Sequence, residues 1–143
     1  MTTLVIVCGS SIRGDDGVGG RVADELERAE RVGIELLRVH QLTPELADDV
    51  AKAGRTIIVD AGLGKRSSLQ RVTAHPGTAL THHLTAQTLV GLVERLYEKT
   101  SEVYLLTVPG SSFALSEHLS VPAEQAAVRA ARRLIRFLKD RRI

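Results

Sequence analysis

The sequence contains a single cysteine, Cys8, and this scarcity limits the chemistry open to the protein. One thiol cannot form an internal disulfide or a thiolate cage around a metal ion. Zinc-finger folds are therefore excluded, and any metal site must use oxygen and nitrogen ligands. Cys8 closes an apolar run, which favours a position in the core over a catalytic role.

Aromatic residues and long apolar runs are also scarce. Aromatic residues make up 3% of the chain and its formal net charge is only +2, so few rings are available to stack on bases and a general nucleic-acid binder is not expected. No apolar run has membrane-spanning length, and the first residues lead into Leu4–Val7 without a charged leader. We therefore expect a cytoplasmic protein outside the membrane. The sequence does not decide whether it works as a monomer.

The chain has 143 residues, of which 43% are hydrophobic, enough for one sizeable core. We expect a single domain over residues 1–143. Cations gather near the end of the chain, at spacings that fit the polar face of a terminal helix. A solvated face is the expected role, and docking to an acidic partner is the alternative. These cations are Arg129, Arg132, Arg133, Arg136, Lys139, Arg141 and Arg142.

Strand-like and helix-like segments alternate along the chain. Short apolar runs predict strands at residues 3–8, 34–40, 56–60, 69–75 and 103–108. Helical spacing of apolar residues predicts helices at 16–30, 43–54, 85–98 and 120–141. This alternation predicts an α/β fold, a three-layer α/β/α sandwich with a mainly parallel, twisted sheet of about five strands.

Capping residues stand where the predicted helices begin. Thr85 is expected to cap the third helix, and the last helix has a cap and Pro122 in its first turn. Thr43 and Pro44 are expected to open the second helix. An aspartate at a helix start is most often an N-cap, and both Asp15 and Asp16 stand at the start of the first helix.

A glycine-rich loop, Gly9–Gly14, follows the first predicted strand. Its outer glycines have the spacing of a phosphate-binding loop, but that motif continues with a lysine and a hydroxyl residue. Here Asp15 and Asp16 follow instead, and two negative charges would face a polyanion. The dinucleotide spacing G-x-G-x-x-G is missing as well, so phosphate binding at this loop is disfavoured.

Acidic residues follow two of the predicted strands. Ligand sites of open α/β sheets lie outside the carboxyl ends of the strands. Only one of Asp15 and Asp16 can cap a helix, so the other points to solvent or leans over the strand ends toward Asp60. Asp60 itself has a second possible role, as a loop acid that bonds to nearby backbone amides. With His82 or His83, both placed in a predicted loop, the set becomes two carboxylates and an imidazole. Such a set suits a divalent transition metal and leaves coordination positions free.

The segment Val5–Val22, VIVCGSSIRGDDGVGGRV, resembles the opening of the nickel-iron hydrogenase maturation proteases. Those enzymes remove a C-terminal extension from the precursor of the hydrogenase large subunit. The resemblance implies that Asp16 contacts the metal. Asp60, within IIVDAG, matches the second acidic position of the family.

The third ligand in that family is a histidine a few residues before an apolar helix, which favours His82 and keeps His83 as the alternative. The resemblance thus implies an endopeptidase with Asp16, Asp60 and His82 as catalytic and metal-contacting residues. It also implies that the metal is nickel supplied by the precursor, so that cleavage follows nickel insertion.

This sequence departs from the family pattern at three points. Ser10 stands where asparagine is common, Asp16 is shorter than the frequent glutamate, and Val108–Pro109 replaces a glutamine-proline pair. Two other functions compete with the protease. One is a non-catalytic chaperone that binds a partner's nickel site, and the other is a small-molecule hydrolase that uses the carboxylates with a divalent metal.

Overall fold

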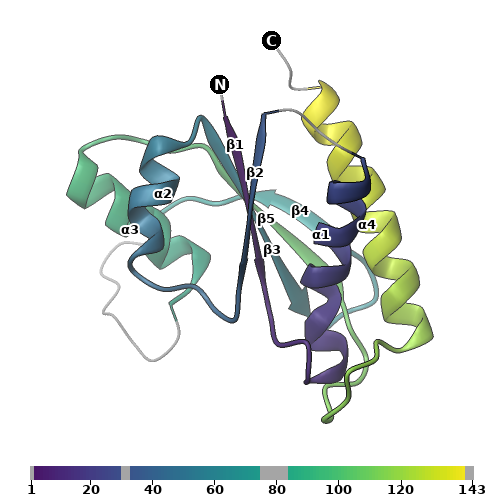
Figure 1. Cartoon of the computed structure of the whole chain (residues 1–143). Helices are drawn as coiled ribbons and strands as arrows, with labels where there is room; N and C mark the ends of the chain where they lie inside the picture. The colour runs from purple at the N-terminus through teal and green to yellow at the C-terminus, as the bar shows by residue number, and fades with distance from the viewer. Residues whose placement is uncertain (1, 30–32, 75–83, 141–143) are drawn as a thin grey trace.

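The computed structural model describes residues 2–29, 33–74 and 84–140, and it contains a five-stranded sheet (Figure 1). The strand order is β2-β1-β3-β5-β4, and all neighbouring pairs are parallel except β4 and β5. The strands are β1 (Thr3–Cys8), β2 (Ile34–Val39), β3 (Arg55–Gly62), β4 (Ser68–Arg71) and β5 (Val103–Pro109).

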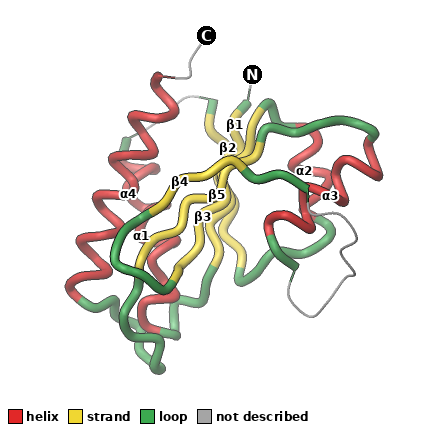
Figure 2. Tube along the Cα trace, turned by 180° about the vertical axis from the view of Figure 1, so that it is seen from behind, coloured by secondary structure: helices red, strands yellow, loops and turns green. Residues whose placement is uncertain are grey.

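Helices cover both faces of this sheet. They are the 3-10 helix η1 (Gly14–Gly17), α1 (Val18–Arg28), α2 (Leu46–Lys52), α3 (Ala86–Tyr97) and α4 (Val121–Asp140). Helices α1 and α4 lie on one side and α2 and α3 on the other, as Figures 1 and 2 show from opposite directions. The predicted three-layer sandwich with a mainly parallel sheet is therefore confirmed. Within the described ranges, no helix is both long enough and apolar enough to cross a bilayer.

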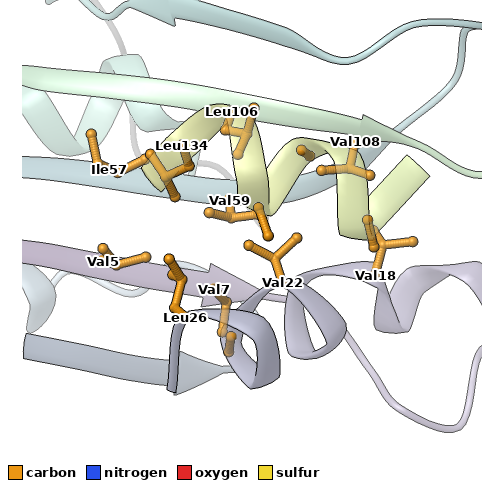
Figure 3. Close-up of a cluster of buried hydrophobic side chains, with 14 of the residues drawn as sticks. Val5, Val7, Val18, Val22, Leu26, Ile57, Val59, Leu106, Val108 and Leu134 are labelled. Carbon is orange, nitrogen blue, oxygen red and sulfur yellow. The ribbon is translucent and has the colours of Figure 1, made fainter. Parts of the chain in front are cut away.

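Strand alternation divides the apolar residues between two cores. In β1, Val5 and Val7 pack with α1 and α4, whereas Leu4, Ile6 and Cys8 pack with α2 and α3. Successive side chains of a strand point to opposite faces, so a strand covered on both sides reads as a continuous apolar run. Figure 3 shows the first core, in which side chains of β1, β3 and β5 meet α1 and α4. The core position expected for Cys8 is confirmed, since it is buried.

The start of the first helix differs from the prediction. Residues 14–17 form the 3-10 turn η1, and α1 begins only at Val18. Neither Asp15 nor Asp16 caps a helix, because η1 and α1 have no side-chain cap bond. Gly14 adopts a left-handed φ of 56°, and the backbone N–H of Asp15 donates to Ser112 O at 2.7 Å. Contacts with a distant loop thus override the local helix signal.

Two of the other helix starts follow the prediction and one does not. The Thr85 hydroxyl accepts a hydrogen bond from Thr88 N at 3.1 Å, and α4 begins directly after Ser120, whose hydroxyl accepts from Ala123 N at 3.3 Å. Helix α2 begins at Leu46, later than predicted. The Thr43 carbonyl accepts from Leu46 N there, and α2 has no side-chain cap bond.

The strand β4 is shorter than predicted and runs antiparallel to β5 at the edge of the sheet. Residues 63–67 connect it to β3. This connection is too short for the crossover that joins parallel strands, so the chain must reverse direction. The apolar run at 69–75 could not reveal that reversal.

We predict that Leu134→Ala lowers the free energy of unfolding by about 2–5 kcal/mol, because it opens a cavity in a close-packed core. Leu134 is fully buried on α4, between α1 and the sheet (Figure 3). Urea denaturation measures the loss. The exposed neighbour Arg132→Ala serves as the control, and an equal loss in both variants would contradict this packing.

Candidate active site at the carboxyl edge of the sheet

The turn that carries the acidic pair lies directly against the end of β1. Gly9 has a φ of 138°, and a Cβ atom there would lie 1.9 Å from the backbone oxygen of Asp16. A Cβ at Gly19 would lie 2.8 Å from Cys8 O. Only residues without a side chain permit such close approach, so these two glycines bring η1 and the start of α1 onto the strand.

Asp16 turns its side chain back over the glycine loop. Its Oδ2 accepts a hydrogen bond of 2.6 Å from Ser10 N, and the side chain is partly buried. A backbone donor at this distance fixes the orientation of the carboxylate. Of the two orientations open to the second acid, the one toward the strand ends is observed.

Asp60 lies in β3 on the face that α2 and α3 cover, since Ile58 two residues earlier packs in that core. Val7 pairs with Val59, so Cys8 and Asp60 come next along neighbouring strands. The Asp60 Oδ1 accepts a hydrogen bond from Ala61 N at 2.8 Å. The bond to a nearby backbone amide, one of the two roles considered for Asp60, is thus present.

The charges of Asp16 and Asp60 act on each other. Burial raises the pKa of Asp60, the hydrogen bond from Ala61 opposes that rise, and the negative charge of Asp16 adds to it. Burial, followed by the charges of Asp60 and Asp16, raises the pKa of Cys8 to about 12. The structure therefore brings the two predicted acids together beside a thiol that stays protonated.

Two like charges in a partly buried place favour a bound cation, because a divalent ion removes their repulsion. Carboxylate oxygens suit such an ion. His82 and His83, the two candidates for the third ligand, lie outside the described residues. Among residues 2–29, 33–74 and 84–140, no group of three or more histidine, cysteine, aspartate or glutamate side chains is placed to hold a metal. The roles assigned to Asp16, Asp60 and His82 stay predictions.

Asp15 has a different environment from Asp16. Its side chain is completely buried, and its carboxylate accepts hydrogen bonds from Ser111 N (2.7 Å), Ser112 N (2.9 Å), Ser120 N (2.7 Å) and the Ser120 hydroxyl (2.7 Å). Burial by itself raises the pKa of Asp15, but these donors, led by Ser120 and Ser111, outweigh it and lower the pKa to about 2. Asp15 is therefore a charged structural anchor.

The anchor ties the glycine loop to residues 110–120, which join β5 to α4. Gly14 N donates to Ser116 O at 2.9 Å, and Ser116 N donates to Ile12 O at 3.0 Å. A Cβ at Gly110 would lie 2.8 Å from the Cβ of Asp15. The two loops thus form one bonded unit beside Asp16. Sequence reasoning missed the serines of this unit, because nothing in their spacing marks them as partners of Asp15.

Solved structures with the same arrangement of helices and strands are known. The hydrogenase maturating endopeptidase HybD from E. coli superposes with a TM-score of 0.78 at 19% identity, over 98% of this chain and 93% of that one. The chain has the fold of hydrogenase maturation proteases. The [NiFe] hydrogenase maturation protease HycI from Thermococcus kodakarensis gives a TM-score of 0.74 at 20% identity, over 96% of this chain and 92% of HycI.

A third structure, the hydrogenase 2 maturation peptidase from Thaumarchaeota archaeon SCGC_AB-539-E09, has a TM-score of 0.72 at 20% identity. The superposition covers 97% of this chain and 99% of that peptidase. No protein-family model matches the sequence, and no curated protein matches it with significance. At these identities the likeness establishes the fold, and it agrees with the resemblance found in the first motif.

We predict that Asp15→Asn destabilises the protein by about 2–4 kcal/mol. The asparagine side chain has no charge, and its NH2 group would face the N–H and O–H donors that now bond to the carboxylate. The change in urea midpoint measures this. Asp24→Asn is the control, since Asp24 is exposed and bonds only to Arg38 on the surface. A loss no larger than that of the control would show that Asp15 does not anchor the loops.

The low pKa of Asp15 predicts how stability depends on pH. The folded pKa, about 2, lies below the ordinary value of 3.8. The charged form therefore stabilises the fold fully above the unfolded pKa, and this contribution, roughly 2 kcal/mol, is lost as pH falls from about 4 to about 2. Subtracting the stability of Asp15→Asn from that of the wild type at each pH isolates the effect. The difference should shrink over that range, and a constant difference would contradict the assignment.

Proposed function

We propose that this protein is an endopeptidase that removes the C-terminal extension of a nickel-iron hydrogenase large-subunit precursor after nickel insertion. It contacts the nickel through Asp16, Asp60 and His82, with His83 as the alternative. One observation carries the proposal. The charges of the two carboxylates act on each other at the carboxyl edge of a sheet whose fold is that of hydrogenase maturation proteases.

Nickel enters this proposal as part of the substrate. Two carboxylates and one imidazole form an incomplete ligand set, which binds tightly only when the precursor supplies the remaining ligands. The repulsion between Asp16 and Asp60 supports this role, because a cation between them relieves it. A precursor without nickel lacks that contact, so cleavage reports successful insertion.

Hydrolysis of the extension needs an attacking water and a group that takes up its proton. The two carboxylates are candidates, and the raised pKa of Asp60 makes it the stronger base. As the water oxygen bonds to the scissile carbonyl carbon, a carboxylate oxygen accepts the proton. The proton then passes to the leaving amine as the peptide bond breaks.

The loops around the site support a protein substrate. Large apolar side chains are exposed there. Exposed apolar side chains that lie together usually mark surfaces that contact other proteins. They lie in the glycine loop, after β3, in the loop after β5 and at the start of α4. They are Ile12, Leu63, Phe113, Leu115 and Val121. We place the reaction in the cytoplasm, where the single thiol stays reduced.

We predict that Asp16→Asn and Asp60→Asn each slow processing of a nickel-loaded precursor by at least about 100-fold, since each removes a charge that contacts nickel or moves a proton. The intact mass of the precursor, followed over time, measures the rate. Asp24→Asn is the matched control, because it removes a surface carboxylate away from the edge. Full processing by Asp16→Asn would disprove the role of Asp16.

The same samples separate the competing functions. A precursor of unchanged mass in a stable complex with the wild-type protein would identify a nickel-site-binding chaperone. Hydrolysis of a generic phosphate ester, with no processing of the precursor, would identify a small-molecule hydrolase.

A further inference from the structure

A cationic groove runs along α4 on the side that faces β4. It contains two adjoining pockets, of about 290 Å³ and 440 Å³. The first is lined by Lys65, Arg66, Ser67 and Arg129, and the second by Arg71, Arg133 and Arg136. The guanidinium of Arg133 donates to Ser67 O at 3.4 Å, so the linings of the two pockets meet.

The cations come from three segments that converge on the groove, one of which is the end of β4, with Arg71. Arg129, Arg133 and Arg136 stand at i, i+4 and i+7, which places them on one face of α4. Lys65 and Arg66 lie in the connection between β3 and β4. The only carboxylate in either lining is Asp140, near the end of α4. The groove therefore concentrates positive charge that the small net charge of the chain does not reveal.

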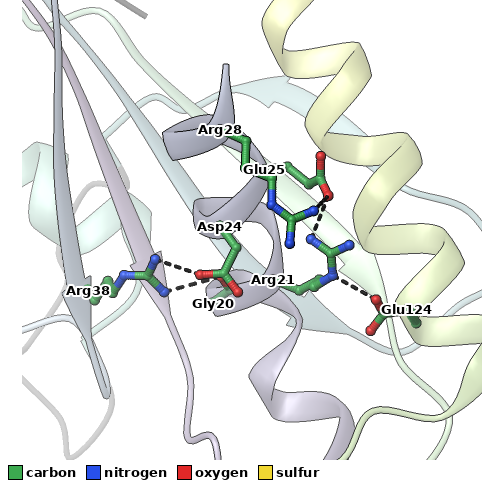
Figure 4. A network of polar contacts seen from close by, with 7 residues as sticks. All are labelled: Gly20, Arg21, Asp24, Glu25, Arg28, Arg38 and Glu124. Atoms are coloured by element: carbon green, nitrogen blue, oxygen red, sulfur yellow. Dashed lines mark hydrogen bonds and ion pairs between the residues drawn. The ribbon is translucent and has the colours of Figure 1, made fainter. Parts of the chain in front are cut away.

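Several cations elsewhere in the described chain form ion pairs with carboxylates, whereas those of the groove form none there. Figure 4 shows Arg21 bonded to Glu25 and Glu124, and Arg38 bonded to Asp24. The ion pairs of residues 2–29, 33–74 and 84–140 include none of Lys65, Arg66, Arg129, Arg133 or Arg136. Glu124 of α4 faces α1 and is already paired, so it cannot neutralise the groove.

The shape of the groove fits an extended polypeptide. From Arg129 to Arg136 the helix rises by roughly 10 Å, the length of about three residues of a strand. One wall is β4, an edge strand that pairs only with β5 in the described chain. Edge strands offer free backbone groups to a further extended segment.

Nucleic acid fits the groove less well. Binding of single strands needs exposed rings on which bases stack. In the groove Tyr104 is only 7% exposed, and its ring contacts Phe137 edge to face at 4.9 Å while Arg71 lies over it. The rings are thus used in packing, and the accessible groups are guanidinium and ammonium ions.

We propose that this groove binds an acidic, extended segment of a partner protein, whose carboxylates pair with Arg129, Arg133 and Arg136. Guanidinium groups suit this role, because they bind carboxylates through two parallel hydrogen bonds. The groove and the Asp60 side chain lie on opposite faces of the sheet. Binding in the groove therefore does not depend on the proposed protease activity.

The test is fluorescence anisotropy with a labelled synthetic peptide of about eight residues that has glutamate at alternate positions, which in a strand point to one side. Binding at low salt should weaken as salt is added. The double variant Arg129→Gln/Arg136→Gln should weaken peptide binding by about tenfold or more. The control, Lys52→Gln/Arg95→Gln, makes the same charge change on α2 and α3 and should weaken peptide binding by less than about twofold.

A charge swap supplies the second measurement. Arg129→Glu/Arg136→Glu should lose the glutamate peptide and gain binding to a matched peptide with lysine at the same positions. Four results would overturn the proposal. They are no binding at low salt, equal weakening by both double variants, equal binding of a glutamine peptide, and tighter binding of single-stranded DNA of the same charge.

Discussion

The buried carboxylate of Asp15 is the interaction on which the edge of this protein depends. It accepts hydrogen bonds from Ser111, Ser112 and Ser120, and so joins the end of β1 to the loop that leads from β5 to α4. A buried charge is stable only when its hydrogen bonds are complete, so the loops must keep this arrangement. Asp16, the next residue, is thereby held over the strand ends.

The alternation of the parallel strands explains why the second acid lies where it does. Residues of β3 point by turns to the two cores, and Asp60 continues the series of Ile58 on the side of α2 and α3. There it is partly buried, next to Cys8 and within the field of Asp16. One acid from the turn after β1 and one from β3 therefore lie within each other's field at the carboxyl edge of the sheet, where α/β folds bind ligands.

Most of the fold follows from the sequence, because apolar periodicity and helix caps are local signals. Thr85 illustrates this, since its hydroxyl caps α3 as predicted. Features that depend on distant contacts do not follow. The sequence could not show that Asp15 is buried by a loop nearly a hundred residues away, or that β4 turns antiparallel at the edge. Asp16 and Asp60 were found as a pair because both lie at or beyond the carboxyl end of a predicted strand, Asp60 as the last residue of 56–60 and Asp16 just after the glycine loop that follows 3–8. The choice between His82 and His83 lies outside the described residues.

We propose that the carboxylate pair makes cleavage conditional on the metal of the substrate. Asp16 and Asp60 repel each other, and we propose that the nickel of the precursor relieves this repulsion, since the ligand set is too small to hold a cation firmly without the precursor. The most direct measurement is the intact mass of a hydrogenase large-subunit precursor, with and without nickel, after incubation with the wild-type protein. We predict loss of a C-terminal peptide from the nickel-loaded precursor alone. Equal cleavage of the nickel-free precursor, or no cleavage of either, would contradict it.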